Sequence, residues 1–192
     1  MTIKNILLYT MILLQAAACS QRERPDITAS PGRLMDSLPG SSPYLTKDNN
    51  GNMLISWVRS ITDSTAIFCY SRSTDGGNSF GPVISIPSST NIKPHAENLP
   101  KIIFKKSGEI IALWGVGNPN PNNKYSGLVY YSQSFDEGKT WQAAKPLVND
   151  TAGYDQRYYD VSLLPSGEAA IIWLDNRSQG GRDGSALYYA AT

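Results

Sequence analysis

Two aspartates occupy the same place in two nearly identical phrases of this 192-residue chain. Asp75 lies in STDGGNSF, residues 73–80, and Asp136 lies in SFDEGKTW, residues 134–141. An aspartate can act as a general acid or base, so a repeated aspartate suggests a catalytic pair. Each phrase, however, has the composition of a turn, in which the carboxylate accepts hydrogen bonds from backbone N–H groups of its own loop. We therefore expect Asp75 and Asp136 to be structural.

The other shared positions of the two phrases fit the same structural role. A glycine two residues after the aspartate can adopt a positive φ, and an aromatic residue at the end can pack between sheets. The predicted structural residues are Ser73, Asp75, Gly77 and Phe80 in the first phrase, and Ser134, Asp136, Gly138 and Trp141 in the second. The phrases thus predict two rigid hairpin turns of one design.

The segments around these phrases belong to a longer repeat. Each of three copies has a strand-like run, a turn glycine, a second run that ends at a tryptophan, and a third run. The turn glycines and the tryptophans are Gly51, Gly108, Gly167, Trp57, Trp114 and Trp173. Both sets are spaced by 57 and then 59 residues, which is typical of a repeat architecture. In the first two copies the phrase leads into a fourth run.

Four short antiparallel strands in each repeat predict the blade of a β-propeller. We expect an all-β fold with about three such blades, in repeats of about residues 43–90, 98–148 and 157–192, the last lacking its fourth strand. Because propellers usually close with about four to eight blades, this organisation predicts a partial propeller.

The first residues predict export. An apolar run, residues 6–14, follows Lys4, and three alanines stand directly before Cys19. This pattern resembles the signal of bacterial lipoproteins, which implies a signal peptide over residues 1–19 and a lipid on Cys19. A plain cleaved signal is the alternative. Residues 20–42 are rich in Pro, Ser and Gly and predict a tether, so we expect a membrane-anchored protein in the periplasm or at the cell surface.

Composition argues against several classes of function. The 17 basic and 16 acidic residues give a net charge of +1 without a basic run, so we expect no nucleic-acid partner. Cys19 and Cys69 are the two cysteines, and Cys69 lies in a strand-like run where it fits a small buried residue. With one histidine and no paired cysteines, the sequence predicts no metal site and no cofactor.

The order of strands predicts where a ligand surface lies. In an up-and-down blade, the turns after the first and third strands share one face, and the loops after the second and fourth strands share the other. The second face receives the longer loops, which are richer in charged and aromatic residues and better suited to bind a ligand. His95, the single histidine, lies on this face and is a candidate contact for a ligand, although a lone loop histidine is more often simply exposed.

The two phrases resemble the Asp-box of the sialidase-like family, also called bacterial neuraminidase repeats, over about residues 43–192. This resemblance implies a propeller, usually of about six blades, and exo-sialidase activity on sialylated or related glycans. Asp-boxes also occur in propellers without that activity. A non-catalytic module that binds glycan or protein is therefore the alternative, and whether the chain is an enzyme stays open.

The resemblance also implies site residues in the third repeat. Arg157 stands ten residues before Gly167, like the arginine that begins a sialidase blade, although Tyr158 and Tyr159 replace the Ile-Pro of that motif. An Asp-x-Arg-like segment follows the second strand, with a further aspartate in the loop. These residues are Asp175, Arg177 and Asp183. The arginines would bind the carboxylate of a sialic acid and Asp183 would be the proton donor; a local ion pair among loop charges is the alternative.

Overall fold

The computed structural model describes residues 32–118, 126–149, 155–177 and 184–192. The chain divides into two units, Met1–Met35 and Asp36–Thr192, and every element described below belongs to the second. No helix in the described part of the chain is long and apolar enough to cross a membrane.

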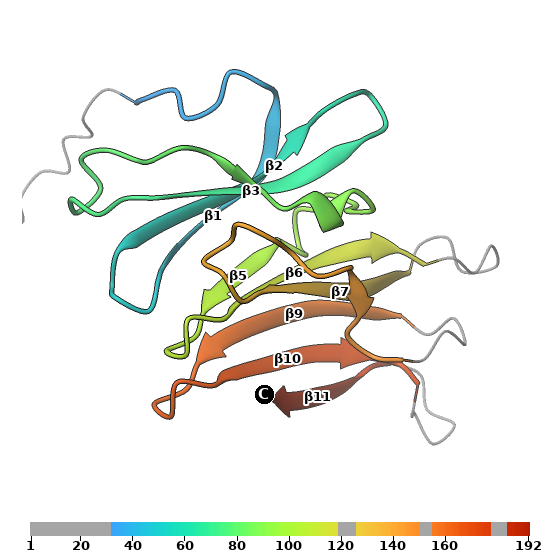
Figure 1. The fold of residues 1–192 in the computed structure, drawn as a ribbon. Helices are drawn as coiled ribbons and strands as arrows, with labels where there is room; N and C mark the ends of the chain where they lie inside the picture. Colours follow the sequence, from blue (N-terminus) through green and yellow to red (C-terminus); the bar gives the residue numbers. More distant parts are fainter. Residues whose placement is uncertain (1–31, 119–125, 150–154, 178–183) are drawn as a thin grey trace, which may run out of the picture. The chain divides into compact units, whose positions relative to one another are not determined.

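Three antiparallel sheets, one for each sequence repeat, make up the second unit (Figure 1). The first sheet runs in the order β1 (Gly40–Lys47), β2 (Met53–Ser60), β3 (Ala66–Arg72) and β4 (Ile84–Ser85). The second runs in the order β5 (Lys101–Phe104), β6 (Ile110–Gly117), β7 (Gly127–Ser134) and β8 (Lys145–Pro146). The third contains β9 (Gln156–Leu163), β10 (Ala169–Asp175) and β11 (Ala186–Ala191), with β10 in the middle. One 3₁₀ helix, η1 (Pro87–Ser89), follows β4.

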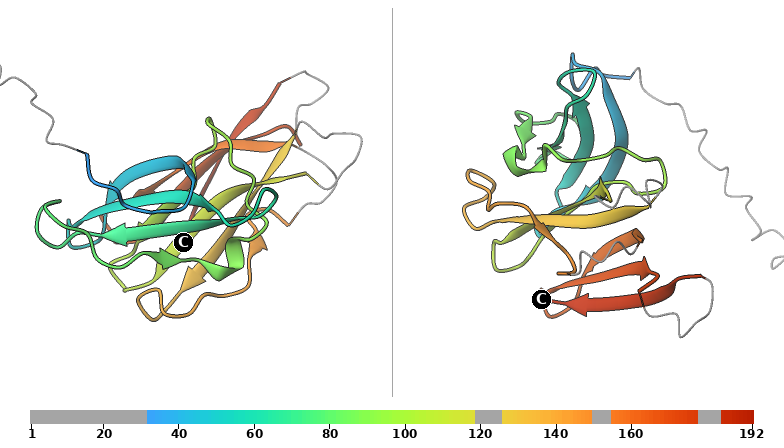
Figure 2. Two further views of the ribbon diagram at one scale, coloured as in Figure 1. Left: turned by 90° about the horizontal axis from the view of Figure 1, so that it is seen from above. Right: turned by 90° about the vertical axis from the view of Figure 1, so that its right-hand side faces the viewer.

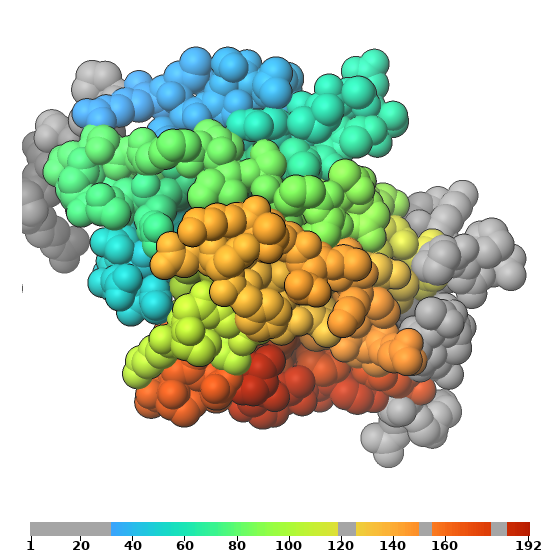
Figure 3. Space-filling model, in the orientation of Figure 1, coloured from blue at the N-terminus to red at the C-terminus, as the bar shows by residue number. Residues whose placement is uncertain are grey.

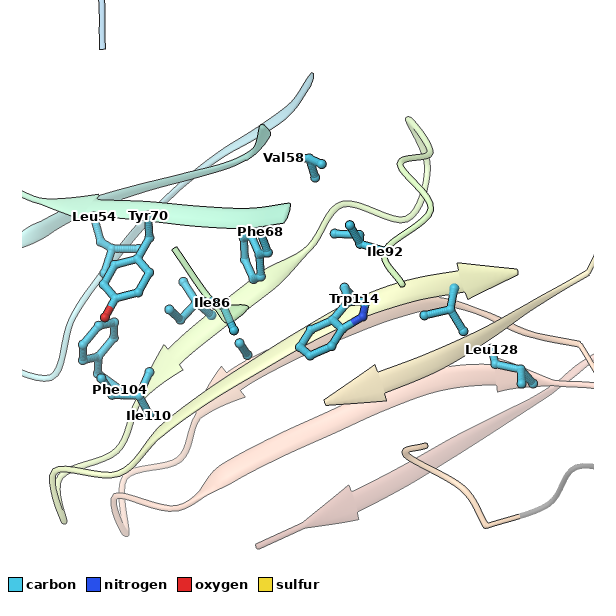
Figure 4. Close-up of a cluster of buried hydrophobic side chains, with 13 residues drawn as sticks. Leu54, Val58, Phe68, Tyr70, Ile86, Ile92, Phe104, Ile110, Trp114 and Leu128 are labelled. Carbon is cyan, nitrogen blue, oxygen red and sulfur yellow. The ribbon is translucent and has the colours of Figure 1, made fainter. Parts of the chain in front are cut away.

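The middle sheet is buried on both faces because β6 is apolar at nearly every position, so each face of the strand carries apolar side chains. Ile110, Ala112 and Trp114 of β6 pack toward the first sheet, with Phe68 and Tyr70 (Figure 4). On the opposite face of β6, apolar side chains pack toward the third sheet. This second cluster contains Ile103, Ile111, Leu113, Val129, Tyr159, Ala169, Ile171 and Trp173. The three sheets therefore stack face to face, as Figures 2 and 3 show.

This arrangement confirms the all-β prediction with propeller-type blades. The turns between the first two strands of each sheet lie together on one side of Figure 1, and their glycines have the positive φ that a tight turn requires. These glycines are Gly51 (φ 81°), Gly108 (φ 92°) and Gly167 (φ 93°). The loop between β2 and β3 and the segment between η1 and β5, which belong to the face predicted to bind a ligand, follow the opposite ends of the strands.

The fourth strands are shorter than the sequence patterns suggest. The runs at residues 82–87 and 143–148 form only the two-residue strands β4 and β8. Proline explains the difference, because Pro82, Pro87 and Pro146 have no N–H group to donate to a neighbouring strand.

The structured part of the second unit begins earlier than the predicted repeat. β1 starts at Gly40, three residues before the expected boundary at residue 43. The carboxylate of Asp36 accepts hydrogen bonds from Trp57 Nε1 at 2.8 Å and Arg59 Nε at 2.6 Å. These contacts fix the segment before β1 against β2, within the range predicted as tether.

Candidate functional site

The first aspartate phrase forms a closed network of hydrogen bonds. Asp75 Oδ1 accepts from the backbone N–H of Ser79 at 2.9 Å and from Ser73 Oγ at 2.8 Å. Ser73 Oγ in turn accepts from the N–H of Gly77 at 2.8 Å. The side-chain oxygens of this network therefore accept hydrogen bonds from groups of the turn itself.

The second phrase repeats the network with the same geometry. Asp136 Oδ1 accepts from the N–H of Thr140 at 2.8 Å and from Ser134 Oγ at 2.9 Å, and the N–H of Gly138 binds Ser134 Oγ at 2.8 Å. The hydroxyl of Thr140 lowers the pKa of Asp136 to about 2, and the hydroxyl of Ser79 does the same for the pKa of Asp75. Carboxyl groups with such pKa values are ionised at neutral pH and are poor proton donors.

A cavity of about 70 Å³ lies on the opposite side, between the second and third sheets. Three of its residues, Lys93, His95 and Asn98, come from the segment between η1 and β5. Others come from the end of β6 and the start of β7. The first residues of β9 complete it, with Gln156, Arg157 and Tyr159. The structure thus brings two of the predicted substrate contacts, His95 and Arg157, to one cavity.

The carboxylate of Asp155 positions Arg157 in this cavity, and Gly127 leaves room for the arginine side chain. Asp155 Oδ2 accepts from Arg157 Nε at 2.7 Å and pairs with Nη2 at 2.5 Å, while Asp155 Oδ1 accepts from the N–H of Gly127 at 2.8 Å. A Cβ atom on Gly127 would lie 3.3 Å from Arg157 Cγ, so the glycine provides room for the arginine stem. Asp155 therefore orients the guanidinium and occupies its Nε–Nη2 edge.

A backbone bulge places the next two residues of β9. Tyr158 has a positive φ of 54°, a conformation that is strained for a non-glycine residue, and its N–H donates to Asn98 Oδ1 at 2.7 Å. Its hydroxyl donates to Glu97 Oε2 at 3.2 Å, at an exposed position beside Arg157. Tyr159 is buried, which raises the pKa of its hydroxyl, and it donates to the backbone oxygen of Asn98 at 3.4 Å.

Arg177 and Asp175 form a separate pair. Arg177 Nη2 lies 2.6 Å from Asp175 Oδ2, and the guanidinium lies over the ring of Tyr188, 4.6 Å from its centroid. Asp175 is fully buried at the end of β10, directly opposite Gln156 in the strand pairing. Arg177 does not line the cavity that holds Arg157, so the described structure does not bring the two predicted arginines into one pocket.

Two predicted residues lie outside the described part of the chain. Asp183, the predicted proton donor, and Cys19, the predicted lipidation site, both stay sequence-based proposals. Within the described ranges, no group of three His, Cys, Asp or Glu side chains is arranged to hold a metal ion.

Sequence reasoning missed several residues of the cavity. Lys93, Asn98 and Gln156 line it, and Asp155 positions its arginine. Asn98 did carry a signal, since it stands at the place of Arg157 in the preceding repeat. For Gln156 the available signal is a polar side chain at the start of a strand that also contains apolar residues.

Comparisons with known proteins support the fold. No family model and no curated protein sequence matches the chain. Among solved structures, an alpha-L-arabinanase of Penicillium chrysogenum, complexed with arabinobiose, aligns with 79% of this chain and 46% of its own at 16% identity and a TM-score of 0.55. A protein of unknown function from Dyadobacter fermentans aligns with 84% of this chain and 51% of its own, at 20% identity and a TM-score of 0.54.

An endo-arabinase from Bacteroides thetaiotaomicron is similar in the same way, over 79% of this chain and 55% of its own, at 12% identity and a TM-score of 0.51. The chain thus spans about half the length of these structures. At such identities the likeness establishes a shared fold, and the site must be interpreted from its own residues.

Proposed function

We propose that this chain forms part of a sialidase-like glycoside hydrolase that binds an acidic sugar in the cavity beside Arg157. One observation carries the proposal: the charged residues among the described lining of the cavity are basic. Lys93 and Arg157 line it together with His95, and none of the described lining residues is Asp or Glu. A sugar carboxylate suits such a cavity better than a neutral sugar does.

The pairing of Arg157 with Asp155 defines how this carboxylate would bind. Asp155 occupies the Nε–Nη2 edge, so a ligand would approach the Nη1 side of the guanidinium. A held guanidinium loses little conformational freedom when it binds, which favours a planar acid. Lys93 would add a second positive charge from the segment before β5.

Hydrolysis needs a proton donor and a nucleophile in addition to this binding group. Asp183 is the proposed donor from the Asp-x-Arg-like segment, and it lies outside the described residues. Sialidases use a tyrosine nucleophile, because a neutral group avoids repulsion by the substrate carboxylate. Among the described residues the candidate is Tyr158, because its ring centroid lies 5.5 Å from the Arg157 guanidinium carbon and its hydroxyl donates to Glu97 Oε2.

A glycan-binding propeller without hydrolysis is the second candidate. It is favoured by the same lining, which offers no carboxylic acid among its described residues. Both candidates predict binding of an acidic sugar, and they differ in turnover.

The test compares a fluorogenic sialoside with a fluorogenic arabinofuranoside, using the mature, full-length protein. We expect release of fluorophore from the sialoside only, and an about 10-fold or greater loss of activity in Arg157→Lys, which keeps the charge but changes the donor geometry. Arg72→Lys is the matched control, because Arg72 pairs with Asp48 on the turn side of the first sheet. Sugar binding without turnover would support the non-catalytic candidate, and cleavage of the arabinofuranoside alone would refute the acidic-sugar proposal.

A further inference from the structure

A buried amide without a hydrogen-bond partner among the described residues lies in the wall of the same cavity. Gln156 is 1% exposed, and neither its Nε2 nor its Oε1 makes a hydrogen bond to another group in the described part of the chain. Most buried polar side chains are paired, because an unpaired amide loses its hydration without compensation. Gln156 is one of the residues that line the cavity, so a group that enters the cavity comes to lie beside this residue.

Neighbouring groups do not compete for this amide. Asp175 is its partner in the strand pairing, but the Asp175 carboxylate binds the backbone N–H of Arg177 at 2.9 Å and its guanidinium at 2.6 Å. Asn98 uses its Oδ1 to accept from the N–H of Tyr158. The hydroxyl of Tyr159 donates to the Asn98 backbone. The polar groups around Gln156 thus have contacts of their own.

The chemistry of an amide indicates what it would bind. Nε2 donates and Oε1 accepts, so the matching ligand offers an acceptor and a donor side by side. Two neighbouring hydroxyl groups of a sugar meet this requirement. A volume of about 70 Å³ is smaller than a typical ligand pocket of ~300 to 1,000 Å³, so it suits part of one sugar, its carboxylate and nearby hydroxyl groups, rather than a whole glycan.

We infer that Gln156 is a specificity-determining residue that binds a pair of neighbouring hydroxyl groups of the sugar. This inference rests on the proposed function, in which Arg157 holds the carboxylate of the same ligand. The two groups are consecutive in β9 and both line the cavity, so one acidic sugar can contact both.

The experiment uses Gln156→Met, which keeps the length of the side chain and removes its polar atoms. Two probes are titrated calorimetrically: N-acetylneuraminic acid, and an analogue whose hydroxylated side chain is shortened by two carbons. The wild-type protein is expected to bind the full sugar about 10-fold more tightly than the short one, and Gln156→Met is expected to bind both equally weakly. Without ligand, Gln156→Met should raise the midpoint of thermal unfolding by about 2 to 6 °C, since it no longer buries an unpaired amide.

Controls separate this inference from the function on which it rests. Gln142→Met, at an exposed position after β7, should change neither the affinity nor the unfolding midpoint. Arg157→Lys should weaken binding of both probes by the same factor. Equal binding of the two probes by the wild type, unchanged in Gln156→Met, would overturn the role of Gln156 and leave the proposed function standing. Failure of the wild type to bind either probe would overturn both.

A second variant keeps the test possible if Gln156→Met does not fold. Gln156→Leu is used if Gln156→Met does not fold, with the same expected loss of discrimination between the probes. If both apolar variants are less stable than the wild type, then the amide is paired in solution and the inference is wrong.

Discussion

Gly138 is the point where the second aspartate phrase touches the neighbouring sheet, and replacing it tests how the blades pack. Gly138 has a φ of 87°, and a Cβ atom at this position would overlap the hydroxyl oxygen of Tyr70 in β3. Tyr70 is 2% exposed and makes edge contacts with Phe104 and Trp141, at centroid distances of 6.0 and 6.5 Å. The ring therefore has little space into which it can move.

The cost of Gly138→Ala has two parts. A positive φ costs a non-glycine residue about 1 to 2 kcal/mol, and overpacking a buried site costs about 1 to 3 kcal/mol more. The matched variant is Gly77→Ala in the first phrase, where φ is 94° and the added Cβ would lie 3.1 Å from Met53 Sδ. Because a methionine side chain adapts readily, Gly77→Ala should cost only the backbone part, about 1 to 2 kcal/mol.

Tyr70→Phe isolates the contact between the sheets. The Tyr70 hydroxyl is buried and has no hydrogen-bond partner within the described ranges, and burial raises its pKa to about 12. Removing this oxygen should leave stability unchanged or raise it, and should reduce the cost of Gly138→Ala to that of Gly77→Ala. Urea unfolding of the four proteins of this double-mutant cycle gives the coupling free energy, which we expect to be about 1 to 3 kcal/mol. If Gly138→Ala costs the same in the wild-type protein and in the Tyr70→Phe variant, the packing argument is refuted.

Three further predictions concern the turn network, the third sheet and the N-terminus. The pKa of Asp136 is about 2 in the folded protein, against 3.8 for an ordinary aspartate, so between these pH values the unfolded chain binds more protons. The free energy of unfolding should therefore fall as the pH drops through this window. Asp136→Asn should flatten this part of the pH profile of unfolding. Arg177→Lys should cost about 1 kcal/mol by losing its contact with Tyr188, yet leave sugar affinity unchanged; weaker binding would place Arg177 in the site. Cys19→Ala should release the protein from the membrane fraction, and unchanged membrane association would contradict lipidation.

Local signals in the sequence account for the parts of the fold that could be predicted. Each turn glycine and the apolar runs on both sides of it specify a hairpin within about a dozen residues, so strands such as β6 and β10 follow from the pattern. The length of β4 and β8 could not be predicted as readily. It depends on which backbone N–H groups remain for pairing near Pro87 and Pro146, and on the neighbouring strand.

The candidate site depends on contacts that a repeat pattern does not contain. His95 and Arg157 could be placed on one face from strand order alone. Their shared cavity, however, requires the bulge at Tyr158 and the hydrogen-bonded ion pair between Asp155 and the Arg157 guanidinium. The resemblance to the sialidase motif groups Arg177 with Arg157, whereas the described position of Arg177 depends on its pairing with Asp175.

The central claim is that the cavity beside Arg157 recognises the carboxylate of a sugar. The most direct measurement is a calorimetric titration of the full-length protein with N-acetylneuraminic acid and with its methyl ester, which differs by the loss of the negative charge. The account predicts that the acid binds about 10-fold or more tightly than the ester, and that Arg157→Lys removes most of this difference. Equal affinities of acid and ester in the wild-type protein would contradict it.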